Sequence, residues 1–243
     1  MPTQRRVLKV LSSSRSGASS RTAAILALGG YTSPARMKRI FAQLDRHFPH
    51  AGCLLRYASA FELLVATILS AQCTDKRVNL VTPNLFRKYS TPQAFSVLQP
   101  EALEQDIYST GFFRSKAKNI IEMSKKLVRE FNGKVPRTME ELLTLPGVAR
   151  KTANVVLGTA FGIASGIVVD THVLRVSTRR LRLSREKTAA KVEQDLLKIV
   201  PRRRWIRFSY QFTLFGREIC LARKPRCAEC PLEPICDSPE KTI

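Results

Sequence analysis

The sequence has few acidic residues. Its 243 residues include 19 aspartates and glutamates against 41 lysines and arginines, which gives a formal net charge of +22. Such an excess of positive charge indicates a polyanionic partner, with nucleic acid as the first candidate. A basic protein of the ribosomal type, or one that adsorbs to charged surfaces, is the alternative that charge alone leaves open.

The sequence also lacks a hydrophobic run of the length that a membrane span requires. The best candidate is the stretch 152–169, which has 18 residues without a charge. It is slightly short for a transmembrane helix, and it contains Asn154, Gly158, Gly162 and Gly166. We therefore expect a buried helix followed by a loop, with no transmembrane segment and no membrane partner.

Residues 1–34 lack acids altogether, while they contain five arginines or lysines and a cluster of serines. This composition predicts a disordered basic extension that tracks phosphates, or a stretch added by an early start codon. It also fits an organelle transit peptide. The whole length of 243 residues suits one large or two small domains.

A turn of proline and glycine opens the stretch 145–170. Thr138 begins a capping box for a helix that Pro146 and Gly147 end, and a second helix is expected to start near Val148. Because the amide groups at a helix start lack partners within the helix, such a turn can bind anions such as phosphate. An ordinary turn between two helices is the alternative.

Two charged residues enclose the apolar run that follows this turn. Lys151 falls in the first turn of the second helix beside Arg150, where the helix dipole, the neighbouring cation and loss of solvent favour a neutral amine. A neutral lysine is a nucleophile suited to Schiff-base formation. Asp170 fits an N-cap, and a carboxylate held that way could also accept a proton or stabilise a cation. A phosphate-binding lysine and a purely capping aspartate are the alternatives.

Two other turns carry residues that could protrude from the protein surface or face a binding groove. Gln72 follows the apolar segment 61–69, which predicts a buried helix, and polar residues after such a helix are expected to face a groove. Phe112 follows the turn glycine Gly111 and is a candidate for an exposed wedge, whereas its neighbour Phe113 also fits the core. A glutamine that simply ends its helix is the alternative for Gln72.

Four cysteines within 17 residues form the last chemical motif: Cys220, Cys227, Cys230 and Cys236. Disulfides are not expected in an intracellular basic protein, and four thiolates suit either zinc or an iron–sulfur cluster. Zinc sites usually have two close cysteine pairs, whereas this motif has one, and its spacing also differs from the ferredoxin pattern. The residues alone leave zinc and a cluster equally open.

The sequence LPGVARKTANVV, followed by VVDTH, resembles the helix-hairpin-helix and the aspartate loop of the endonuclease III family of DNA glycosylases. The resemblance extends from about residue 35 to residue 236, and its separate motifs agree in order and spacing. It implies a bifunctional DNA glycosylase and AP lyase of base excision repair. Such an enzyme excises oxidised pyrimidines from duplex DNA through a lysine Schiff base and cleaves the strand 3′ to the abasic site by β-elimination.

The resemblance also implies a role for each candidate residue. Lys151 is the nucleophile that attacks the sugar, and Asp170 accepts a proton and stabilises positive charge on the sugar. Gln72 enters the space left by a flipped-out nucleotide, and Phe112 inserts into the base stack. The four cysteines hold a [4Fe–4S] cluster, since their spacing is similar to that of the family's C-terminal loop. The other expected DNA contacts come from the hairpin and from the loop between the first two cysteines: Gly147, Ala149, Arg150, Arg223, Lys224 and Arg226.

The implied fold is all-α, with two helical domains of which one is inserted into the other. A helical barrel at about 53–164 is expected to carry the helix-hairpin-helix at about 137–157. Residues 35–52 and 165–243 are expected to form the iron–sulfur cluster domain. The predicted nucleophile and carboxylate then lie at the mouth of the cleft between the two domains.

The expected partner is duplex DNA with damaged pyrimidines or abasic sites, bound by a monomer. The expected compartment is the cytoplasm or nucleoid of a prokaryote, or an organelle if residues 1–34 are a transit peptide. One alternative is another glycosylase of the same superfamily, specific for adenine or for mismatched thymine. A second is a non-catalytic protein that uses the hairpin and metal loop to dock on DNA, and the presence of Lys151, Asp170 and Gln72 speaks against it.

Overall fold

The computed structural model describes residues 32–242, which form an all-α protein with no β-strand among them. The predicted basic extension, 1–34, lies outside these residues except at its last three positions. No helix in the described part is both long and apolar enough to span a membrane. The α-helices are, in chain order, α2 (Pro34–His47), α3 (Ala60–Leu69), α4 (Asp75–Lys88), α5 (Pro92–Ser96), α6 (Pro100–Ile107), α7 (Phe113–Phe131), α8 (Met139–Leu143), α9 (Arg150–Phe161), α10 (Thr171–Arg175), α11 (Ala189–Ile199) and α12 (Trp205–Glu218).

Most of these helices begin at a residue whose side chain can bond the first free amides. Ser59 caps α3, Thr74 caps α4 and Asp170 caps α10, and each accepts a hydrogen bond from an amide two or three residues later. Proline begins α2, α5 and α6, because the first helical position requires no donor. Thr91 caps α5 by accepting a hydrogen bond from the Ala94 amide, and Pro100 is the first residue of α6.

The described chain buries two separate hydrophobic cores. The first is built from residues within 55–157 and includes α3, in which residues 63–66 are fully buried. The second combines α2 with residues within 167–235. This division is what the predicted architecture requires. An inserted barrel has its own core, and both ends of the described chain build the other core. The domain boundaries predicted near residues 52 and 164 fall between the two cores and stay a prediction.

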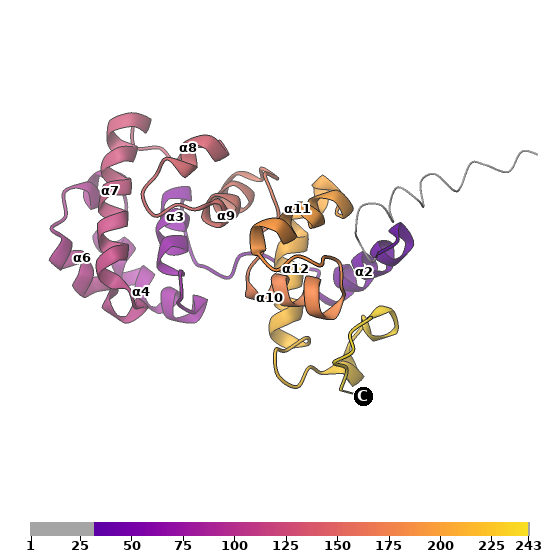
Figure 1. The fold of residues 1–243 in the computed structure, drawn as a ribbon. Helices are drawn as coiled ribbons and strands as arrows, with labels where there is room; N and C mark the ends of the chain where they lie inside the picture. Colours follow the sequence, from indigo (N-terminus) through magenta and orange to yellow (C-terminus); the bar gives the residue numbers. More distant parts are fainter. Residues whose placement is uncertain (1–31, 243) are drawn as a thin grey trace, which may run out of the picture.

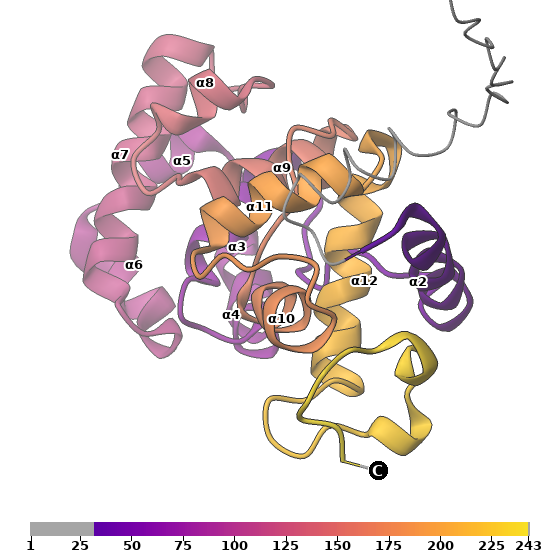
Figure 2. The same ribbon diagram turned by 45° about the vertical axis from the view of Figure 1, so that its right-hand side comes forward.

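The helices form two groups that lie side by side (Figure 1). One group contains α3, α4 and α6 to α9, and the other contains α2, α10, α11 and α12. α2 packs against α12, so segments from both ends of the described chain build the outer domain (Figure 2). The chain crosses from the first group to the second between α9 and α10, and the cysteine-containing segment lies beyond the end of α12.

The basic helical segment 171–180 changes geometry after its fifth residue. α10 ends at Arg175, and a π-helical turn follows as far as Arg180. Within this turn Arg180 is buried, and its guanidinium binds the Glu240 carboxylate in the C-terminal segment at 2.8 Å. Helical periodicity reports only on local spacing, so it could not predict a partner from the end of the chain.

Candidate DNA-binding pocket and metal centre

The predicted helix-hairpin-helix is formed by α8 and α9. Thr138 begins α8 by accepting a hydrogen bond from the Glu141 amide at 3.3 Å, and its hydroxyl donates to the Glu141 carboxylate at 2.7 Å. The turn depends on Gly147, which has a φ of 77°, and a Cβ there would lie 2.9 Å from the Asn119 Cβ. The hairpin is therefore pressed against α7, and its tip requires glycine.

The start of α9 leaves its first amides without a capping side chain. The helix begins at Arg150, two residues later than predicted, because the Val148 amide still bonds back to the Leu145 carbonyl at 3.1 Å. Ala149 is the N-cap residue, and its methyl group makes no cap bond. Ala149 and Arg150 are both exposed. Backbone amides at such a helix start can bind a phosphate oxygen.

Lys151 lies in the first turn of α9, as predicted, and lines a pocket to which both domains contribute. The residue is exposed, and no other described residue forms a hydrogen bond or ion pair with its ammonium group. The pocket has a volume of about 300 Å³, and Asp170 and Gln72 also line it. The predicted nucleophile, carboxylate and gap-filling glutamine therefore share one pocket.

Asp170 is held by three hydrogen bonds. Its Oδ1 atom accepts from the amides of His172 at 2.9 Å and Val173 at 2.7 Å, and its Oδ2 atom accepts from the Thr213 hydroxyl at 3.0 Å. Asp170 is therefore the N-cap of α10, as predicted. Thr213 comes from α12, and sequence reasoning missed it. Bonds on both oxygens give the carboxylate a fixed position in the pocket.

The rest of the pocket lining contains few groups that could carry a charge. Cys53 and Tyr210 lie there, and burial raises the pKa of both side chains, so both are neutral at physiological pH. Arg217 and Asp75 also line the pocket and form an ion pair of 2.7 Å with each other. The predicted lysine and aspartate are therefore the charged groups of the lining that remain available for chemistry.

Gln72 and Phe112 occupy tight turns with left-handed backbone angles, with φ values of 52° and 50°. Such angles are uncommon for residues other than glycine, and they persist where the surrounding structure enforces them, often at functional sites. Phe112 has 62% of its surface exposed, while Phe113 is partly buried against the barrel core. Of the two phenylalanines, Phe112 has the exposure that a wedge requires.

A buried lysine connects these two turns. Lys116 is 4% exposed, and its ammonium group donates to the Leu69 carbonyl at 2.7 Å and to the Thr110 carbonyl at 2.9 Å. Leu69 ends α3 just before the Gln72 turn, and Thr110 precedes Phe112 by two residues. Burial lowers the pKa of Lys116. Sequence reasoning missed this residue, although helical periodicity places it on the apolar face of α7.

Replacing Lys116 by methionine is expected to destabilise the protein by about 2 kcal/mol, because two buried carbonyl groups lose their donor. Lys118→Met, on the exposed side of the same helix, is the matched control, with an expected change of less than about 0.5 kcal/mol. Urea-induced unfolding followed by circular dichroism measures both variants. Equal stability of the two variants would show that the Lys116 ammonium group does not hold the turns.

Arg150 has a protein partner that the sequence did not indicate. Its guanidinium donates to the two carboxylate oxygens of Glu193 at 2.9 and 3.2 Å. The side-chain amide of Asn154 donates to the same carboxylate at 3.0 Å. Glu193 is buried in α11 of the outer domain. The phosphate contact predicted for Arg150 therefore competes with an ion pair inside the protein.

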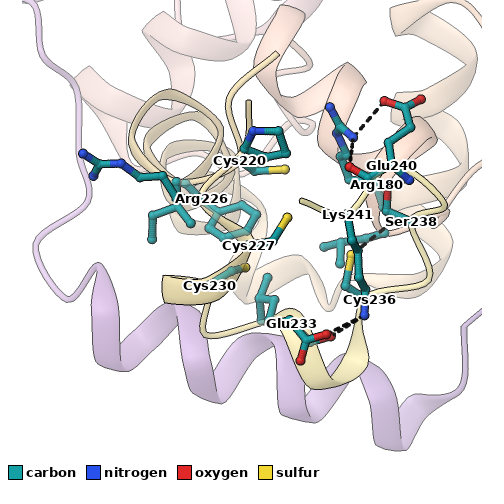
Figure 3. Close-up of a pocket in the computed structure, with 15 residues that line it drawn as sticks. Arg180, Cys220, Arg226, Cys227, Cys230, Glu233, Cys236, Ser238, Glu240 and Lys241 are labelled. Atoms are coloured by element: carbon teal, nitrogen blue, oxygen red, sulfur yellow. Dashed lines mark hydrogen bonds and ion pairs between the residues drawn. The ribbon is translucent and has the colours of Figure 1, made fainter. Parts of the chain in front are cut away.

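The four predicted cysteines surround one pocket beyond the C-terminal end of α12 (Figure 3). Cys220 is buried and the other three are partly buried. Burial raises the pKa of Cys220 and Cys230 to about 11. A thiol with such a pKa becomes a thiolate at neutral pH when a metal ion stabilises the negative charge. The donor set therefore fits a thiolate-bound metal centre.

The four cysteines do not form a preassembled site for one metal ion. Within the part of the chain that the structure describes, no three side chains of His, Cys, Asp or Glu are close enough together to hold a single metal ion. A zinc site requires four ligand atoms at about 2.0–2.3 Å from one centre. The four sulfur atoms instead line the sides of a common space (Figure 3).

The basic loop between the first two cysteines lies on the surface. Arg223, Lys224 and Arg226 are all exposed, and Lys224 has a left-handed φ of 51°. Arg226 lies 4.0 Å from the carboxylate of Glu229, at the limit of an ion pair. None of the three basic residues belongs to the lining of the Lys151 pocket. They form a separate positive surface on the outer domain.

Residues 65–202 match a family described as the HhH-GPD superfamily of base excision DNA repair proteins. The chain is 52% identical to endonuclease III of Synechocystis sp. over 84% of this chain and 92% of that relative. It is 49% identical to endonuclease III of Bacillus subtilis over 84% of this chain and 94% of that relative.

Two solved structures similar to this one contain DNA. One is a non-covalent endonuclease III–DNA complex and the other is a trapped endonuclease III–DNA covalent intermediate. Each has a TM-score of 0.80 and 44% sequence identity, and the match covers 85% of this chain and 96% of the other chain. The all-α architecture predicted from the sequence is thus shared with these structures over most of the chain.

Proposed function

The chain belongs to the endonuclease III family, within the HhH-GPD superfamily of base excision DNA repair proteins, and on that premise we propose its activity. It is a bifunctional DNA glycosylase with AP-lyase activity, which removes oxidised or ring-saturated pyrimidines from duplex DNA. The observation that carries the proposal is that Lys151 and Asp170 line one pocket beside the helix-hairpin-helix. The volume of about 300 Å³ falls at the lower end of the range for small-ligand sites.

The enzyme binds duplex DNA mainly through the phosphate groups of the DNA backbone. The uncapped amides at the start of α9, near Gly147 and Ala149, bind one phosphate group. The exposed side chains of Arg223, Lys224 and Arg226 bind others at a distance from the pocket. Because each such contact releases counterions from the DNA, affinity falls steeply as the salt concentration rises.

The damaged nucleotide leaves the base stack and enters the pocket. Phe112 inserts into the stack and Gln72 fills the gap, and these contacts offset the few kcal/mol that unstacking a base costs. Both residues stand on strained turns that Lys116 holds together. A wedge fixed before DNA binds loses little conformational entropy when it inserts.

Lys151 is the nucleophile of the glycosylase step. Its amine attacks the anomeric carbon of the sugar, a carbon–nitrogen bond forms, and the bond between sugar and base breaks with departure of the base. Asp170 accepts the proton that the lysine loses and stabilises the positive charge that develops on the sugar. The three hydrogen bonds to Asp170 keep the carboxylate in place during this step.

The same covalent intermediate leads to strand cleavage. The sugar ring opens as the bond from lysine nitrogen becomes a Schiff base, which acidifies the adjacent hydrogens of the sugar. Removal of one such proton expels the 3′ phosphate by β-elimination, and water then releases the lysine. Glycosylase and lyase activities therefore depend on one amine.

The four cysteines hold a [4Fe–4S] cluster rather than a zinc ion. Support comes from membership of the endonuclease III family and from the spacing of the cysteines, which resembles that of the family's C-terminal loop. A cluster held by these four residues would cross-link the C-terminal loop, because four cysteine ligands leave no open position for substrate. The protein's own contribution is to orient the basic loop between the first two cysteines toward DNA.

Replacing Cys230 by serine is expected to lower the iron content and the visible absorption of the purified protein, and to weaken duplex binding at least tenfold. Metal analysis of the protein as isolated, together with its absorption spectrum, measures the first effect. Cys73→Ser, which changes a partly buried cysteine outside the loop, is the matched control and should retain its iron. One zinc per chain in place of iron in the unaltered protein would contradict the cluster.

The direct test of the proposed activity uses two duplexes, one with thymine glycol and one with an abasic site. Base release from the first and strand cleavage of both are the expected results. Cleavage of the abasic duplex alone would retain the lyase and overturn the proposed base specificity. Tight binding to both duplexes without reaction on either would favour a docking protein over an enzyme.

The proposed site of action is the chromosomal DNA of a prokaryotic cell. The relatives named above are bacterial, which supports this proposal. A monomeric state is also proposed, because the pocket is completed by residues of one chain. Light scattering of the free protein and of its DNA complex tests the monomer directly.

A further inference from the structure

We propose that Glu193 is a positioning residue that fixes the lysine-bearing helix α9 and the loop leading to Asp170 in one arrangement, and that Arg150 serves this network instead of binding a DNA phosphate. The inference rests on the proposed function, because it concerns the geometry of the same two reacting groups. Neither Glu193 nor Arg150 touches the reacting atoms, and both act through the segments that carry those atoms.

The network begins with a bidentate ion pair. Arg150 directly precedes Lys151 in α9, and its Nε and Nη2 atoms donate to the two carboxylate oxygens of Glu193 at 2.9 and 3.2 Å. The Glu193 side chain is 6% exposed, whereas that of Arg150 is 42% exposed. A buried carboxylate requires a partner to offset its loss of water, and the planar guanidinium matches its geometry. Arg150 therefore has a function inside the protein.

The network continues to the loop before Asp170. Asn154 is 4% exposed, and its amide nitrogen donates to Glu193 at 3.0 Å. The amide oxygen of Asn154 accepts from the Ser165 hydroxyl at 2.8 Å. One turn of α9 and the loop between α9 and α10 are thus connected to a single carboxylate of α11.

Gly166 shows how closely the loop approaches this network. A Cβ atom at Gly166 would lie 2.2 Å from a Glu193 carboxylate oxygen and 2.6 Å from the Asn154 amide nitrogen. The absence of a side chain therefore lets the loop backbone lie directly against the network. Gly166 stands four residues before Asp170, so the network lies against the same short loop that carries the carboxylate.

The two roles of Arg150 make different predictions. A phosphate contact needs a positive charge, which lysine also provides. The bidentate bond to Glu193 needs a guanidinium, which lysine cannot replace. The logarithm of the binding constant falls linearly with the logarithm of the salt concentration, and we call the steepness of this line the salt slope. Each phosphate contact adds about 0.9 to it. A positioning residue leaves that slope unchanged and alters the rate of the bound complex.

The test measures single-turnover cleavage of an abasic duplex at saturating enzyme, together with salt-dependent binding, for Arg150→Lys, Glu193→Gln and Gly166→Ala. We expect the bound complex to react about tenfold to a hundredfold more slowly in all three variants, because small displacements of reacting groups have effects of that size. The salt slope should equal that of the unaltered protein. Arg129→Ala, on the exposed surface of α7, is the control and should change neither quantity.

Gly166→Ala disturbs the network in a second way, since it removes no charge and no hydrogen-bonding group but places a Cβ 2.2 Å from the Glu193 carboxylate. Circular dichroism of each variant establishes that the rates compared are those of folded protein. Arg150→Lys and Gly166→Ala reacting at the rate of the unaltered protein would overturn the positioning role. A salt slope that falls by about one unit in Arg150→Ala would instead assign Arg150 to a phosphate. If the unaltered protein forms no borohydride-trapped adduct, the proposed function fails, whereas normal adduct formation with unaffected variants refutes the network alone.

Discussion

Lys151→Ala is expected to cleave an abasic duplex at least about 10³-fold more slowly than the unaltered protein, because the nucleophile of the covalent step is absent. Base release from a thymine glycol duplex should fall with it, since one amine performs both reactions. Gel-based cleavage assays under single-turnover conditions measure both rates. Lys151 is exposed, and its ammonium group forms no hydrogen bond or ion pair with any other described residue, so its removal should leave folding intact.

Two comparisons make this result specific. Lys125→Ala, at an exposed position of α7 that pairs with Glu122, should cleave normally and shows the effect of losing one positive charge. Binding of Lys151→Ala to an uncleavable abasic analogue should stay within a few-fold of the unaltered protein. Strand cleavage that persists in Lys151→Ala would assign the Schiff base to another amine.

Asp170→Asn is expected to lower the rate of base release by about 10²- to 10⁴-fold, because an amide can neither accept the lysine proton nor stabilise a developing cation. Its stability should change little, since asparagine is as good an N-cap as aspartate. The Oδ1 bonds to the amides of His172 and Val173 can be kept by the amide oxygen. Chemistry and capping are thereby separated at one position.

Asp170→Ala provides the matched comparison, because it removes both roles. Loss of the cap is expected to lower the free energy of unfolding by about 1 kcal/mol, with a further decrease if the Thr213 hydroxyl is left without a partner. Thermal unfolding of the two variants measures the difference. An asparagine variant that is fully active would reduce Asp170 to a structural cap.

Local sequence signals were sufficient for much of the candidate site. Pro146 and Gly147 predicted the hairpin turn, and Asp170 predicted the start of α10. The four cysteines line one pocket, while the metal that they bind stays a prediction. These signals are strong because each depends on the backbone or on neighbouring residues. The turn at Gly111 also favours an exposed residue directly after it. Phe112 is exposed there, and Phe113 is partly buried.

Contacts between distant segments could not be predicted in the same way. Lys116 is bonded to carbonyls of two other turns, Arg150 is bonded to α11, and Arg180 is bonded to the C-terminal segment. In the sequence each is one of many basic residues in a chain with a net charge of +22. The burial of a positive charge depends on which segments pack around it, and the amino-acid composition does not predict that packing.

The measurement that tests the central claim most directly is the location of the covalent bond. The unaltered protein is treated with borohydride on an abasic duplex, the adduct is digested with a protease that does not cleave at lysine, and the peptides are identified by mass spectrometry. We predict a reduced sugar fragment on Lys151. A fragment attached to any other residue, or no adduct while the strand is cleaved, would contradict the assignment of Lys151 as the nucleophile.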